Sequence, residues 1–89
     1  MPGSDRLRAF PNPFLDGTVI RAASGTPGVE AAVEVLDANG RRVRRLVPAA
    51  GETAWDGRDE HGDRVAAGVY VVRASSAGQV ETTKVTRIR

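Results

Sequence analysis

The sequence contains no cysteine, one lysine, one tryptophan, one tyrosine and two phenylalanines among its 89 residues. Without cysteine, neither a disulfide framework nor a thiolate metal site is available to support a small fold. No apolar run approaches the roughly 20 residues that a membrane-spanning helix requires, so we expect no membrane insertion. So few aromatic side chains leave little to spare for stacking on sugars or bases. Stability must therefore come from the packing of aliphatic side chains.

The length of the chain limits what it can do. A chain of 89 residues forms one domain near the lower limit of a self-sufficient core. Little room remains for a catalytic cleft, so we expect a binding or structural role, no enzymatic activity and no cofactor. We interpret residues 1–5 as a flexible leader and residues 6–89 as a single domain. The N-terminus lacks the apolar segment of an export signal, so either the natural protein extends further at its N-terminus and residues 1–4 are foreign to it, or the chain stays inside the cell. We expect the first, because the family resemblance set out below starts only at about Phe10.

Valine, glycine and proline indicate the fold class. Valine far outnumbers leucine and isoleucine, which favours strands over helices, and glycine and proline interrupt the chain at short intervals. These features predict an all-β fold, a seven-stranded antiparallel β-sandwich of the immunoglobulin-like or fibronectin-like kind. The expected strands cover residues 6–10, 18–23, 31–36, 41–47, 52–55, 69–74 and 79–89.

The stretch between Trp55 and Tyr70 is expected to organise the rest of the chain. Asp56 and Gly57 predict a tight reversal, because the carboxylate accepts bonds from the following amides and glycine tolerates a positive φ. Gly68 permits a close backbone approach before a central strand rich in β-branched residues. We expect the tryptophan and tyrosine rings to face the core together. The expected centre of the core comprises Trp55, Tyr70, Phe10, Phe14, Val33, Val35 and Val72.

Two other segments predict connections between strands. The run Pro-Asn-Pro-Phe at residues 11–14 cannot be central in a sheet, because two of its residues lack an amide donor. We expect it to follow an edge and to cross between strands at one end of the sandwich, with a recognition loop as the alternative. Residues 37–40 predict a tight hairpin turn, because asparagine and glycine tolerate positive φ.

Four acidic residues gather in the central loop, at Asp56, Asp59, Glu60 and Asp63. Several carboxylates in a glycine-bearing loop are what calcium uses, but the spacing does not match an EF-hand and neighbouring arginines would compete. We therefore expect turn capping by aspartate and no metal site, with calcium binding left open. His61, the only histidine, has no cysteine or plausible hydroxyl nucleophile in fixed relation to it, so we interpret it as an exposed turn residue.

Arg41, Arg42, Arg44 and Arg45 form the sharpest charge cluster. An anion-binding or nucleic-acid face is one interpretation. However, no aromatic residue is interleaved for base stacking, and no recognition-helix pattern is present. We favour a solvated strand whose charges discourage edge-to-edge aggregation, and we expect no nucleic-acid partner.

The chain carries four distinctive segments in a fixed order, at residues 11–14, 37–41, 55–70 and 84–89. In these segments it resembles the immunoglobulin-like domain of the flagellar hook-capping protein and the C-terminal sorting domain of proteins exported by the type IX secretion system. The resemblance runs from about Phe10 to Arg89. The residues of its structural motif are Pro11, Asn12, Pro13, Phe14, Trp55, Asp56, Gly57, Gly68 and Tyr70.

The resemblance implies a non-catalytic C-terminal sorting and attachment module, fused behind a larger cargo and read by export machinery at the outer membrane. In sorting domains the extreme C-terminus is what the machinery needs, and an exposed last strand can be presented to a receptor edge by β-augmentation. We therefore expect a protein that is secreted or held at the cell surface, by way of the periplasm. The expected partner-binding residues are Lys84, Val85, Arg87, Ile88 and Arg89.

Two alternatives stay open. A structural module of the hook-capping kind would contact copies of itself in an extracellular assembly, and it would tolerate residues added after Arg89, whereas a sorting signal needs a free end. A ligand-binding or carbohydrate-binding appendage of a hydrolase would need aromatic side chains, of which this chain has few.

Overall fold

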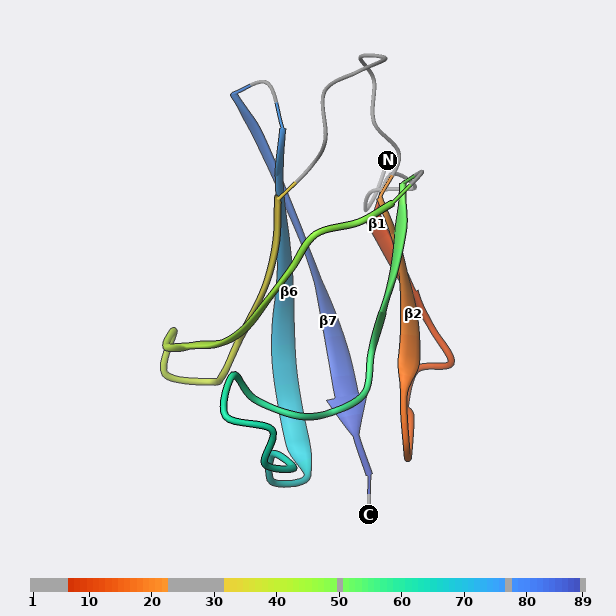
Figure 1. Ribbon diagram of the computed structural model, residues 1–89, viewed down its shortest axis with the longest axis vertical. Coiled ribbons are helices and arrows are strands. Elements are labelled where there is room, and N and C mark those ends of the chain that lie inside the picture. The colour runs from red at the N-terminus through yellow and green to blue at the C-terminus, as the bar shows by residue number, and fades with distance from the viewer. Residues whose placement is uncertain (1–6, 23–31, 50, 77, 89) are drawn as a thin grey trace.

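The computed structural model describes residues 7–22, 32–49, 51–76 and 78–88, and in this part of the chain the fold is all-β. Seven strands of the described residues form two antiparallel sheets that face each other (Figure 1). The predicted seven-stranded β-sandwich is confirmed. The strands are β1 (Leu7–Phe10), β2 (Thr18–Ala22), β3 (Ala32–Leu36), β4 (Arg42–Leu46), β5 (Glu52–Trp55), β6 (Gly68–Ser76) and β7 (Gln79–Arg87).

The two sheets differ in size. The smaller sheet has the strand order β1-β2-β5, and the larger has the order β4-β3-β6-β7. Strand β6 pairs with β3 on one side and with β7 on the other, which confirms that the strand containing Tyr70 is central. The pairing of β6 with β7 is continuous over nine positions, so β7 contains no bulge against β6.

The core lies between the sheets and is centred on three aromatic rings. The ring of Trp55 lies 5.3 Å from that of Phe14 and 5.5 Å from that of Tyr70, in tilted and edge-on geometries. Such pairs contribute about 0.5–1.5 kcal/mol each beyond the burial of apolar area. Aliphatic side chains that alternate inward along the strands complete the core. The fully buried ones are Ile20, Val33, Val35, Val72 and Val85.

Phe10 was expected in the core, and this expectation is wrong. Leu7 and Ala9 point inward from β1, so the alternation of a strand turns Phe10 outward, where it is 42% exposed. The Arg21 guanidinium lies over its ring, 5.6 Å from the ring centre. Phe10 thus takes part in a surface cation–π contact on the smaller sheet.

The predicted turns have mixed outcomes. In the hairpin at residues 37–40, the amide of Gly40 donates to the carbonyl of Asp37, and Gly40 has φ 83°. That turn is confirmed. The last connection is shorter than expected, because β6 continues to Ser76, whereas β7 begins at Gln79 as predicted. The expected leader at residues 1–5 lies outside the described residues.

Candidate interaction site at the final strand

The final strand presents its side chains alternately to the core and to solvent. Val85 is fully buried, and Arg87 is buried with 9% exposure, whereas Lys84 is exposed and Ile88 is 47% exposed. Of the five expected partner-binding residues, Lys84 and Ile88 therefore expose their side chains to solvent. Val85 and Arg87 face the interior because residues two apart on a strand share a face, and Arg89 lies outside the described residues.

The edge of β7 that faces away from β6 is covered by residues 12–14. The amide of Phe14 donates to the carbonyl of Thr86 over 2.9 Å, and the amide of Ile88 donates to the carbonyl of Phe14 over 2.8 Å. Asn12 extends this pairing, since its Nδ2 donates to the Lys84 carbonyl and its Oδ1 accepts from the Thr86 amide. The segment between β1 and β2 thus joins the two sheets, and an added strand at Lys84 to Ile88 would have to displace it.

Arg87 fastens the final strand to the central loop. Its Nη1 donates to the carbonyl of Val65 over 3.0 Å, while its buried Nε has no hydrogen-bond partner within the described residues. The guanidinium packs against Gly57, where an added Cβ would lie 3.1 Å from Arg87 Nε and 3.5 Å from Phe14 Cε2. Gly57 also has φ 75°. The glycine of the Trp-Asp-Gly motif is therefore required both by backbone conformation and by space.

The Trp-Asp-Gly motif ends β5 as its sequence predicts. The Asp56 carboxylate accepts a bond from the amide of Arg58 over 3.1 Å, which is an Asx-turn. The same oxygen accepts from Arg44 Nη1, also over 3.1 Å. Trp55 Nε1 donates to the carbonyl of Arg58 over 2.9 Å, so the buried indole is satisfied. These contacts fix the start of the loop against β4.

The carboxylates of Asp59 and Glu60, further along the loop, accept hydrogen bonds from backbone amides. Asp59 Oδ1 accepts from the amides of Asp63 and His61 over 3.0 and 2.9 Å. The hydrogen bond from the backbone amide of Asp63, together with that from the amide of His61, holds the pKa of Asp59 below its usual range. Glu60 Oε2 accepts from the amide of Arg45 over 2.8 Å. Within the described residues, no three His, Cys, Asp or Glu side chains are grouped to hold a metal ion.

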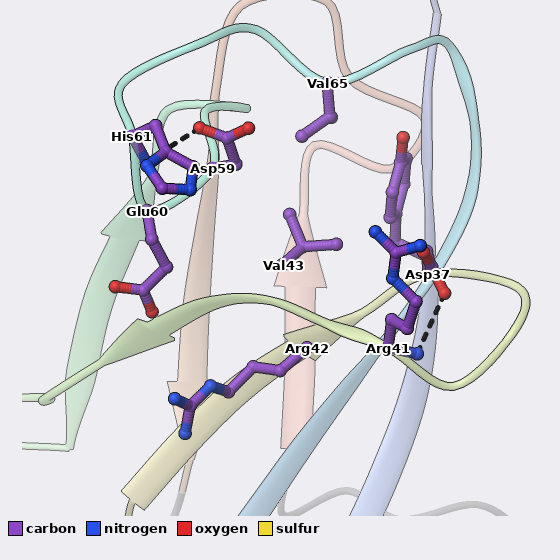
Figure 2. Close-up of a pocket in the computed structure, with 9 residues that line it drawn as sticks. Asp37, Arg41, Arg42, Val43, Asp59, Glu60, His61 and Val65 are labelled. Carbon is purple, nitrogen blue, oxygen red and sulfur yellow. Dashed lines mark hydrogen bonds between the residues drawn. The ribbon is translucent and has the colours of Figure 1, made fainter.

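A hollow of about 310 Å³ opens between this loop and the hairpin at residues 37–41 (Figure 2). Val43 and Val65 lie between the Asp59–His61 side and the Asp37–Arg41 side. Tyr70 also lines the hollow, and its hydroxyl donates to the carbonyl of Ala66 over 2.6 Å. Burial raises its pKa. The described residues that line the hollow include both charge signs. Among them no base is paired with a nucleophile.

The arginine cluster is divided among different partners. Arg44 is used inside the loop, where Nη1 donates to Asp56 and to the carbonyl of Arg58. Arg42 forms an ion pair with Glu34, which also binds Arg73 of β6. The hydrogen bond from Arg73 holds the pKa of Glu34 below its usual range. Neither Glu34 nor Arg73 was predicted as a charged contact, since only the pairing of β3 with β6 places them opposite each other.

Solved structures of known proteins share this fold. The chain is similar to PorZ of Porphyromonas gingivalis, described as an essential bacterial surface component of its type IX secretion system, with a TM-score of 0.77 and 27% identity. The match covers 96% of this chain and 12% of PorZ. Dimeric latent PorU of the same organism matches with a TM-score of 0.71 and 25% identity, over 92% of this chain and 9% of PorU. The chain thus spans about a tenth of either structure.

Other comparisons bear on the fold and the family. CopC from Methylosinus trichosporium OB3b matches with a TM-score of 0.50 and 22% identity, over 91% of this chain and 88% of CopC, which is a likeness of fold alone. No curated protein matches the chain. No helix of the described residues has the length and apolar character needed to cross a membrane. The FlgD Ig-like domain family matches residues 16–79, which contain β2 to β6 and the loop from Trp55 to Tyr70. The chain therefore belongs to the FlgD Ig-like domain family.

Proposed function

We propose that this domain is a non-catalytic sorting and attachment module of a larger secreted bacterial protein, recognised at its final strand by outer-membrane export machinery. The observation that carries the proposal is the likeness to about a tenth of PorZ, a surface component of a type IX secretion system. We expect the domain to be a small part of a longer chain, in which the cargo lies on its N-terminal side. The protein would reach the cell surface or the medium by way of the periplasm.

Recognition of the final strand operates through side chains on its outer side. Residues 12–14 already occupy the edge that an added strand would need. Lys84 and Ile88 remain exposed, one cationic and one apolar, and they lie four residues apart on the same side of β7. Val85 and Arg87 hold the strand in place from the inside. A receptor therefore binds the folded domain. The core contacts of the final strand keep it in place during binding.

The absence of enzymatic activity belongs to this proposal. The small all-β domain provides a hollow without a paired base and nucleophile among the described residues. A carbohydrate-binding role has little support, because Trp55, Phe14 and Tyr70 are buried and Phe10 is engaged by Arg21. The supported role is the binding of a protein partner.

The test is secretion of a fluorescent reporter in a bacterium with an active type IX system. Three fusions are compared: the reporter alone, the reporter followed by this domain, and the same fusion with ten residues added after Arg89. A sorting module exports the second fusion only, or the second much more than the third. Equal export of the reporter with and without the domain would reject sorting.

A structural module of an extracellular assembly is the second candidate, favoured by membership of the FlgD Ig-like domain family. Such a module contacts copies of itself, whereas a sorting module is recognised by the export machinery and needs no contact with its own copies. Sedimentation velocity over a hundredfold range of concentration separates them. A single monomeric species supports sorting, and concentration-dependent self-association supports assembly.

A further inference from the structure

The larger sheet carries a basic surface on the side that faces away from the core. Glu34 lies opposite Arg73 and Arg45 in the two strand pairings, so these three side chains share one side. Arg42 reaches the same carboxylate. Lys84 lies opposite Val71, two residues from Arg73, and therefore points to this side as well. We call this surface, formed by the outward side chains of β3, β4, β6 and β7, the outer sheet face.

The outer sheet face carries a net positive charge. The charged residues named above sum to a formal charge of +3: the acid is Glu34, and the four cations are Arg42, Arg45, Arg73 and Lys84. The whole chain has a formal charge of +2, so all other residues together carry −1. Glu34 is already bound by Arg42 and Arg73, and no acid is paired with the side chains of Arg45 and Lys84 in the described residues. Those two cations are available to a partner.

Exposed aliphatic side chains lie among these cations. Val69 of β6 is 49% exposed and Val80 of β7 is 60% exposed, and the pairing of β6 with β7 puts both on the same side as Lys84. Ile88 follows at the end of the strand with 47% exposure. All four aromatic residues of the chain lie elsewhere, so the face has no ring for stacking on bases or sugars. Cations interspersed with valine and isoleucine instead fit a protein surface with carboxylates around an apolar centre.

The edges of the larger sheet are poorer docking sites than this face. Residues 12–14 cover the β7 edge at its C-terminal end. At the β4 edge, the amide of Glu60 donates to the carbonyl of Val43, and the Glu60 carboxylate accepts from the amide of Arg45. Such covering is how proteins protect exposed strands from pairing with other chains. A partner of the larger sheet therefore meets side chains on the outer sheet face before it meets free backbone groups.

We propose that the outer sheet face is the docking surface of this domain for an acidic surface of a protein partner. The inference deepens the proposed function and rests on it for the identity of the partner, which would belong to the export machinery. The charge and exposure of the face do not depend on that identity. Lys84 and Ile88, at the final strand, then form one margin of a larger interface that extends to Arg45 on β4.

The test is an NMR titration of the ¹⁵N-labelled 89-residue chain with a glutamate-rich peptide of about 20 residues at low ionic strength. We expect amide shifts to concentrate on β4, β6 and β7. In the variant Arg45→Gln with Lys84→Gln, the Kd should rise about fivefold, as expected for two exposed charge contacts. The matched control is Arg8→Gln with Arg64→Gln, which lowers the net charge equally away from the face and should leave the Kd within about twofold. Circular dichroism and thermal unfolding verify that both variants are folded.

Other results would overturn the inference. An equal loss of affinity in both double variants, or shifts spread over both sheets, would mean that only net charge is recognised. Vesicles containing about 30% anionic phospholipid are titrated in parallel. Shifts on the outer sheet face with vesicles and none with the peptide would assign the face to a lipid surface instead. A domain that binds the peptide on this face but fails to export the reporter would leave the interface standing and reject the sorting role.

Discussion

At the scale of single residues, Gly57 is the position where the sequence motif and the core meet. Its φ is 75°, and an added Cβ would approach Arg87 Nε to 3.1 Å. Gly62, in the same loop, has φ 86°, but no atom lies within 4 Å of the position that an added Cβ would take there. The substitution Gly62→Ala should therefore lower the free energy of unfolding only through the strain of a positive φ, by about 1–2 kcal/mol.

The substitution Gly57→Ala adds crowding against Arg87 and Phe14 to the same backbone cost. We expect a loss of about 3 kcal/mol in the free energy of unfolding, measured by urea denaturation of both variants. Equal losses in the two variants would show that the packing of Arg87 against the motif contributes nothing.

The raised pKa of Tyr70 makes the stability of the fold depend on pH in the alkaline range. Burial raises its pKa, so the folded state favours the neutral phenol more than the unfolded state does. The resulting stability is complete below the ordinary tyrosine pKa and is lost as pH rises through the raised value. In Tyr70→Phe the bond to the Ala66 carbonyl disappears, at a cost of about 1 kcal/mol at neutral pH. The decline in unfolding midpoint above the ordinary tyrosine pKa should also become shallower, and an unchanged decline would contradict this assignment.

The lowered pKa values of Glu34 and Asp59 make the stability of the fold depend on pH in the acid range. Hydrogen bonds from Arg73 to Glu34, and from the Asp63 amide to Asp59, lower both carboxyl pKa values. Stability from a lowered pKa is present above the unfolded value and is lost as pH falls through the folded one. We expect the urea midpoint of unfolding to decrease when the pH is lowered below the ordinary carboxyl pKa range. The decrease should be smaller in Glu34→Gln than in the wild type. Asp16→Asn, at a carboxylate that is 79% exposed, is the comparison variant.

At the scale of elements, the connection at residues 12–14 determines how open the final strand is. Asn12 bonds to both Lys84 and Thr86 of β7. In Asn12→Ala, the Thr86 amide loses its acceptor, and its hydrogen exchange should accelerate by at least tenfold. The Gly40 amide, which bonds to Asp37 in a distant hairpin, should exchange at its wild-type rate. No change at Thr86 would mean that the segment does not protect the strand edge.

The local elements were readable from the sequence because their causes are local. Residues 37–40 carry asparagine and glycine where a hairpin needs them, and Asp56 caps its own turn. The alternation of Val33 and Val35 indicated the inward side of β3. The predicted crossover at residues 11–14 is consistent with the segment that joins the sheets.

The remaining features depend on which distant segments meet, and no local pattern encodes that. The burial of Arg87, the covered β7 edge and the Glu34–Arg73 pair all arise from long-range pairing. Hydrophobicity alone predicted burial of Phe10, whereas the alternation begun by Leu7 turns it outward. Likewise, no local pattern indicated that the side chains of Val85 and Arg87 point inward, since this follows from the register of β7 against β6. Their role in partner binding stays a prediction.

At the scale of the whole molecule, the domain has a core held by three aromatic rings and an outer sheet face whose named charged residues sum to +3. The covered edges favour a module that meets other proteins through side chains. Membership of the FlgD Ig-like domain family and the likeness to PorZ agree with such a module in a longer protein.

The most direct measurement of the central claim is export of a reporter fused ahead of this domain in a bacterium with type IX secretion. The decisive variant is Lys84→Gln with Ile88→Ser, which changes the two exposed side chains of the final strand without touching its core residues. The control is Arg8→Gln with Val47→Ser, a matched pair of exposed residues elsewhere. Both purified domains must unfold at the wild-type temperature. We predict that the control is exported and that the decisive variant stays in the periplasm. Equal export of the two variants would contradict recognition at the final strand.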